Sequence, residues 1–120
     1  MKKVFLPAAL LLASLSTAVR ADETGLASIH DWRKERGLTC MSDHFHDGAG
    51  SGESRKAAEA KAVASWASFT ILEYGTDWGS YQLAGSKKMD CSQAGPNSWS
   101  CNVTARACKK AGRMAAKKKK

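Results

Sequence analysis

The sequence lacks several patterns that mark common functional classes. No two of its four cysteines are separated by two to four residues, the spacing typical of structural zinc sites. The phosphate-binding pattern G-x-x-x-x-G-K-[ST] is absent. After residue 21, no apolar run approaches the roughly 20 residues that a membrane-spanning helix needs. We therefore expect neither a Cys-rich zinc module, nor a P-loop nucleotide site, nor a transmembrane segment in the mature chain.

Residues 1–21 have the pattern of a secretory signal peptide. Met1-Lys2-Lys3 forms a short basic start, Val4 to Leu15 is largely apolar, and Val19-Arg20-Ala21 places small residues where a signal peptidase cleaves. The pattern predicts an exported protein, in the periplasm or alternatively secreted. The remaining length suits one domain, which we expect over residues 22–108.

The basic charge is concentrated at the C-terminus. The whole chain has a formal net charge of +8, but residues 22–108 contain 9 basic and 11 acidic residues. Seven basic residues follow Cys108. We therefore expect residues 109–120 to form a flexible basic tail, with an envelope protein or an anionic polymer as its possible partner. No specific nucleic-acid motif is present.

Two cysteines predict a disulfide-closed β-hairpin. Cys91 and Cys101 flank Gly95-Pro96-Asn97, and the segments about 80–92 and 98–107 alternate apolar and polar residues. If Cys91 lies opposite Cys101, then Met89 lies opposite Val103, Asp90 opposite Asn102 and Lys88 opposite Thr104. In this register apolar residues lie opposite apolar residues, and polar residues lie opposite polar ones. Opposed cysteines are within disulfide reach. The remaining pair, Cys40 and Cys108, then forms the second disulfide by elimination.

The chain also predicts one long amphipathic helix over about 53–74. Ser51 or Ser54 can cap its start, and Gly75 suits its end. Residues at helical spacing form the expected buried face: Ala60, Val63, Ala67, Ile71 and Tyr74. The fold class predicted is α+β, with this helix packed on an antiparallel hairpin or small sheet, and with Trp66, Trp78, Met89, Trp99 and Val103 in the core.

Two further segments precede the helix. The pattern of residues 26–36 allows a short helix. Residues 40–52 are expected to form a loop, because Gly48, Gly50 and Gly52 alternate with small residues and constrain the backbone little. The aromatic residues Trp66, Trp78, Tyr81 and Trp99 could instead line a ligand groove, although their spacing favours a core position.

The clearest candidate for chemistry is Asp43-His44-Phe45-His46-Asp47. Asp43, His44, His46 and Asp47 offer imidazole and carboxylate ligands for Zn, Cu or Ni, and on an extended backbone both histidines point the same way. The segment is not an EF-hand, because Phe45 occupies the third position, which needs an oxygen ligand, and Ser54 occupies the twelfth, which needs a bidentate glutamate. The alternative is a small enzyme that uses His44 and His46 as acid and base.

The entry to the helix is a second candidate. Gly50, Gly52, Arg55 and Lys56 surround a predicted helix N-terminus, where backbone N–H groups favour anions. Glu53 would repel an anion there, so a flexible hinge is the better explanation of the glycines.

The chain resembles a set of short exported bacterial proteins of uncharacterised function. The resemblance lies in Gly50-Ser-Gly, Trp66, Glu73-Tyr-Gly75, Trp78, Cys91, Trp99-Ser-Cys101 and Ala105-Arg-Ala-Cys108, and covers roughly residues 44–108. It implies a compact exported module and assigns no catalytic residue. The function expected is that of a small non-enzymatic binding or structural protein, with metal binding and acid–base catalysis as alternatives.

Overall fold

The computed structural model describes residues 25–111, and it confirms the α+β class with one main helix and two disulfides. The predicted signal peptide and most of the predicted tail lie outside the described residues. The elements are α1 (Gly25–Ser28), β1 (Trp32–Glu35), β2 (Leu38–Met41), β3 (His46–Gly52), α2 (Arg55–Tyr74), the 3-10 helix η1 (Thr76–Trp78), β4 (Gly85–Gly95), β5 (Ser98–Arg106) and β6 (Cys108–Lys110).

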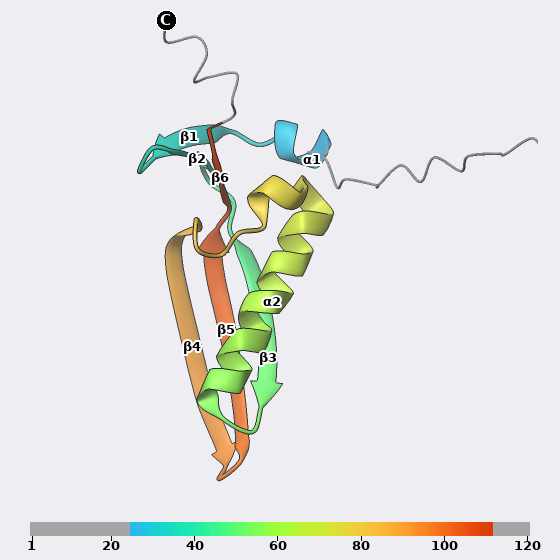
Figure 1. Ribbon diagram of the computed structural model, residues 1–120, viewed down its shortest axis with the longest axis vertical. Helices are drawn as coiled ribbons and strands as arrows, with labels where there is room; N and C mark the ends of the chain where they lie inside the picture. The colour runs from blue at the N-terminus through green and yellow to red at the C-terminus, as the bar shows by residue number, and fades with distance from the viewer. Residues whose placement is uncertain (1–24, 112–120) are drawn as a thin grey trace, which may run out of the picture.

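Two antiparallel three-stranded sheets form the β part. One has the strand order β3-β5-β4, and the other has the order β1-β2-β6. Helix α2 lies across the first sheet, and its C-terminal end points toward α1 and the second sheet (Figure 1). β5 and β6 follow each other with Ala107 between them, so one nearly continuous stretch of chain joins both sheets.

The hairpin register is confirmed. Cys91 pairs with Cys101, Met89 with Val103, Asp90 with Asn102 and Lys88 with Thr104. Both predicted disulfides, Cys91–Cys101 and Cys40–Cys108, are present. The first strand begins at Gly85 rather than about residue 80, because residues 80–84 form a hydrogen-bonded turn. A register shift follows at Ser86, which has a φ of 50°.

Helix α2 is confirmed, but its buried face is rotated relative to the prediction. Ser54 caps its start and accepts a hydrogen bond from Ala57 N, and Gly75 ends it with a φ of 107°. The buried residues are Ala58, Ala62, Trp66, Thr70 and Tyr74, whereas Ala60 is exposed and Val63, Ala67 and Ile71 are half-buried. Alanine side chains are small enough for this face, where the helix backbone lies directly on the glycines of β3.

The predicted loop over residues 40–52 is wrong, since β2 ends at Met41 and β3 spans His46–Gly52. A Cβ on Gly48 would lie 2.5 Å from Trp66 N, and a Cβ on Gly50 would lie 2.7 Å from Ala58 O. Alternate glycines therefore make one smooth face of the strand, on which α2 sits without intervening side chains. They form a packing surface rather than a hinge.

Two other expectations need correction. The helix expected over 26–36 is limited to α1, because Arg36 and Gly37 adopt φ values of 52° and 74° and turn the chain between β1 and β2. Lys109 and Lys110, expected to start a flexible tail, belong instead to β6 and pair with Thr39 and Leu38.

The core combines the helix face with the inner face of the first sheet. Trp66, Trp78 and Val103 are fully buried, as predicted, and Met89 and Trp99 pack against the core from its edge. Trp66 Nε1 donates to the Ala105 carbonyl at 3.2 Å. Trp66 and Trp78 thus serve the core rather than an open groove.

Candidate metal centre

All three histidines of the chain meet at one end of the molecule. His30 follows α1, His44 lies between β2 and β3, and His46 begins β3. The last turn of α2 brings Glu73 and Tyr74 to the same place, where α1, the start of β3 and the end of α2 converge (Figure 1). The two histidines of the predicted loop therefore do lie together, with ring centroids 5.2 Å apart.

His30, His44 and Glu73 form a compact group of possible metal ligands. One ligand atom from each residue lies within 4.8 Å of the other two. The imidazole rings of His30 and His44 stack with centroids 4.5 Å apart and planes inclined by 23°. All three residues are half-buried, so the group is ordered by its neighbours while one side stays open to solvent.

His46 lies behind this group and is 2 % exposed. Its ring stacks on Tyr74 and also contacts Phe69, with both centroid distances at 4.6 Å. Its Nδ1 lies 2.9 Å from Thr70 Oγ1, and that hydroxyl donates to the Trp66 carbonyl at 2.7 Å. Because the hydroxyl proton is used there, the hydroxyl accepts from His46, and Nδ1 carries the ring proton.

The other ring nitrogen of His46 faces the carboxylate. Nε2 lies 2.7 Å from Glu73 Oε2. With the ring proton on Nδ1, two acceptor atoms face each other at short range in a buried place. Such a contact is favourable when a second proton sits on Nε2, which makes the His46 ring a cationic donor to Glu73.

The proton is held weakly at this position. Burial lowers the pKa of His46, and the neighbouring His44 and His30 lower it further, while Glu73 opposes these effects. A lowered pKa means that the folded protein loses this proton at a lower pH than the unfolded chain does. Burial and Glu73 raise the pKa of Tyr74, so its hydroxyl stays protonated. Its ring therefore contributes as an uncharged surface on which His46 stacks.

This shift predicts acid-dependent stability of the metal-free protein. The unfolded chain binds a proton on His46 below about pH 6.5, whereas the folded chain resists it, so the free energy of unfolding should fall as pH drops below that value. One such proton contributes a slope of at most about 1.4 kcal/mol per pH unit. Urea unfolding between pH 7.5 and 5 should show a shallower slope for His46→Gln, and equal slopes would contradict the assignment.

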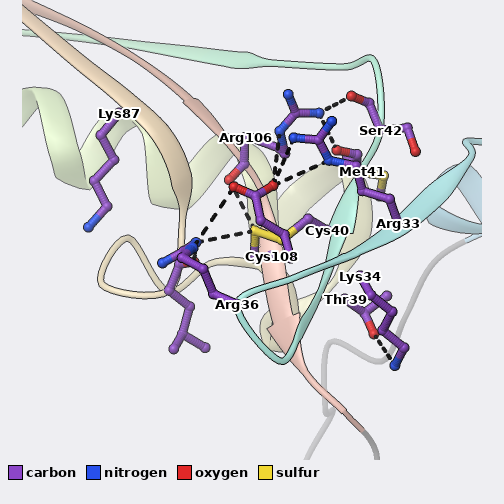
Figure 2. The surroundings of a disulfide bond; sticks show 12 residues. Arg33, Lys34, Arg36, Thr39, Cys40, Met41, Ser42, Lys87, Arg106 and Cys108 are labelled. Carbon is purple, nitrogen blue, oxygen red and sulfur yellow. Dashed lines mark hydrogen bonds and ion pairs between the residues drawn. A yellow bond between two sulfur atoms is a disulfide. The ribbon is translucent and has the colours of Figure 1, made fainter.

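The segment that carries His44 is anchored by a buried arginine. Arg106 Nη1 donates to the carbonyls of Met41 and Ser42, beside the Cys40–Cys108 disulfide (Figure 2). The Arg106 guanidinium lies 4.5 Å from the Phe45 ring centroid, and its Nε lies 3.7 Å from Glu35 Oε2. The backbone on both sides of His44 is therefore tied to β5.

A half-open pocket of about 190 Å³ adjoins the ligand group. Its lining residues are Ile29, His30, Asp31, Asp43 and His44. The Ser42 amide donates to the Asp31 carbonyl at 2.8 Å, which keeps the two acidic segments side by side. His30 and His44 belong both to the pocket and to the ligand group, so the pocket adjoins the group beside these two imidazoles.

The predicted site residues are divided between two places. His44 and His46 are in the cluster and Asp43 lines the pocket, whereas Asp47 projects from the sheet and accepts a 2.6 Å hydrogen bond from Thr104. Sequence analysis missed His30 and Glu73. Glu73 carried a usable signal, because it precedes Tyr74 at the C-terminal end of a helix, where a carboxylate is electrostatically unfavourable.

The glycine-rich entry to α2 has structural partners. Gly50 and Gly52 are paired with Cys101 and Trp99 in the sheet and face the helix. Arg55 forms an ion pair with Glu59, with Nε and Oε1 3.0 Å apart. The Ser54 hydroxyl caps the helix by accepting from Ala57 N. The backbone around Gly50 and Gly52 is therefore extended strand, not a cradle that wraps around an anion.

Comparison of the chain with protein-family models, with curated proteins and with solved structures finds no match. Within residues 25–111, no helix combines the length and apolar character needed to cross a membrane. The two disulfides indicate an oxidising, exported environment.

Proposed function

We propose that the protein is an exported binding protein for a divalent transition metal, held by His30, His44 and Glu73. The observation that carries this proposal is the convergence of three ligand atoms within 4.8 Å from three separate parts of the chain. Two imidazoles and one carboxylate are a donor set suited to Zn²⁺, Cu²⁺ or Ni²⁺. The short basic start of the predicted signal peptide fits export, either to the periplasm or out of the cell.

His46 supports the proposal as a positioning residue. Ligating carboxylates are commonly oriented by a further polar group, and His46 Nε2, which orients Glu73 only when it carries a proton, lies 2.7 Å from Glu73 Oε2. Thr70 in turn fixes the His46 ring. Removal of such an outer group typically lowers metal affinity 10- to 100-fold.

The alternative of acid–base catalysis has less support. Thr70, His46 and Glu73 stand in the order of a nucleophile, a base and an acid. Thr70 is fully buried, however, and its hydroxyl proton is donated to the Trp66 carbonyl. A hydroxyl in that position cannot reach a substrate, so binding without catalysis is the better account.

The test is calorimetric titration of the untagged, disulfide-bonded protein with Zn²⁺, Cu²⁺ and Ni²⁺. We expect one site in the wild type and an affinity at least about 100-fold lower in His30→Gln/His44→Gln, since two of three ligands are lost. Asp47→Asn is the matched control, because Asp47 lies outside the cluster and should leave affinity unchanged. Equal, negligible binding by the wild type and the double variant would refute the proposal.

A further inference from the structure

The ligand group leaves part of the metal's coordination sphere to another molecule. Tetrahedral Zn²⁺ takes four ligands, and sites that bind a further molecule keep three protein ligands and one open position. The chain supplies His30, His44 and Glu73. His30 and His44 also line the pocket, together with Ile29, Asp31 and Asp43, so a fourth ligand that approaches beside these imidazoles would occupy that pocket.

The pocket wall is negatively charged. Asp31 and Asp43 are both exposed, and none of the ion pairs within residues 25–111 uses either carboxylate. Among residues 25–111, two cationic side chains close to this end have other contacts: Arg106 donates to the Met41 carbonyl, and Lys109 lies over the Trp32 ring. Because the metal ion itself attracts the ligand's donor atom, the two carboxylates act on the part of the ligand that lies against the pocket wall, where they favour a positive charge.

We propose that the fourth ligand is a small cationic nitrogen donor, such as an imidazole that carries a separate ammonium group. This inference rests on the proposed metal site. The neutral ring nitrogen would bind the metal, and the ammonium group would lie against Asp31 and Asp43. Ile29, with 72 % of its surface exposed, supplies an apolar wall for the connecting methylene groups.

The size of the pocket suits this ligand class. A cavity of about 150 Å³ can hold a benzene ring. The pocket, at about 190 Å³ and open on one side, therefore has room for the smaller imidazole ring and a short chain. A large anionic chelator such as citrate would clash with the pocket wall and would be repelled by the two carboxylates.

The test compares two ligands that present the same donor atom to the Zn²⁺-loaded protein. One is 4-methylimidazole, which is neutral, and the other is trimethylated histamine, whose quaternary ammonium group cannot itself bind the metal. At low ionic strength we expect the cation to bind about tenfold more tightly, because each nearby carboxylate contributes a few-fold. The preference should largely disappear in 1 M NaCl.

Charge-matched variants locate the effect. Asp31→Asn/Asp43→Asn should reduce the preference to nearly one, whereas Asp47→Asn/Asp90→Asn removes the same charge from the sheet and should retain it. Metal binding with equal affinity for both ligands would overturn this inference and leave the metal site standing. Failure to bind Zn²⁺ in the first place would instead overturn the proposed function on which it rests.

Discussion

Replacement of Gly50 by alanine is expected to prevent stable folding. The added Cβ would lie 2.6 Å from Lys61 Cβ and 2.7 Å from the Ala58 carbonyl oxygen. The Cβ would also collide with Ala62 N, and both Ala58 O and Ala62 N are backbone atoms of α2 that cannot rotate away. Ordinary overpacking costs about 1–3 kcal/mol. Here the helix must move off the strand, so we expect a loss of at least about 4 kcal/mol, comparable with the whole stability of a small domain.

Gly95→Ala is the matched control for this prediction. The nearest atom to a Cβ at Gly95 is Ser98 Cβ at 3.9 Å, which is ordinary contact. We expect a change within about 0.5 kcal/mol there. Urea unfolding followed by far-UV circular dichroism measures both variants. A folded Gly50→Ala protein with near wild-type stability would show that α2 does not rest on the glycine face of β3.

Loss of the Cys40–Cys108 disulfide should have the second largest effect. This bond joins residues 68 positions apart, against 10 for Cys91–Cys101. In the chain-entropy model the longer loop contributes about 4 kcal/mol and the shorter one about 3 kcal/mol. Cys40→Ala/Cys108→Ala should therefore lower the free energy of unfolding more than Cys91→Ala/Cys101→Ala.

The two disulfide variants should also differ in metal affinity. Cys40 lies in β2, which leads into the Met41–Ser42 segment that Arg106 anchors before His44. The Cys91–Cys101 bond lies within the β4–β5 pairing, away from the histidines. We expect weaker metal binding without Cys40–Cys108 and unchanged binding without Cys91–Cys101, measured where both variants are folded. Equal affinities would mean that the second sheet does not position His44.

The hairpin was predictable because its information is local. Apolar and polar residues alternate on both sides of a short turn, so one register satisfies Cys91–Cys101 and all its neighbouring pairs at once. That register left Cys40–Cys108 by elimination. The helix was equally local, with Ser54 and Gly75 marking its ends.

The glycine strand and the metal centre depended on contacts between distant segments. Alternating glycines are compatible with a loop or a strand. The strand forms here because α2 packs on it, and this packing needs a face without side chains at Gly48 and Gly50. His44 was identifiable beside His46, but His30 and Glu73 reach it only after α1 and α2 have packed together. Spacing along the chain could therefore indicate only His44 among the three proposed ligands.

The most direct test of the account is anomalous diffraction at the zinc absorption edge from crystals grown with Zn²⁺. We predict one ordered peak coordinated by an imidazole nitrogen from each of His30 and His44 and by a Glu73 carboxylate oxygen, all at about 2.0–2.2 Å. His46 should remain beside Glu73 without binding the ion. A structure with no peak at this place, or with zinc bound by other residues, would contradict the account.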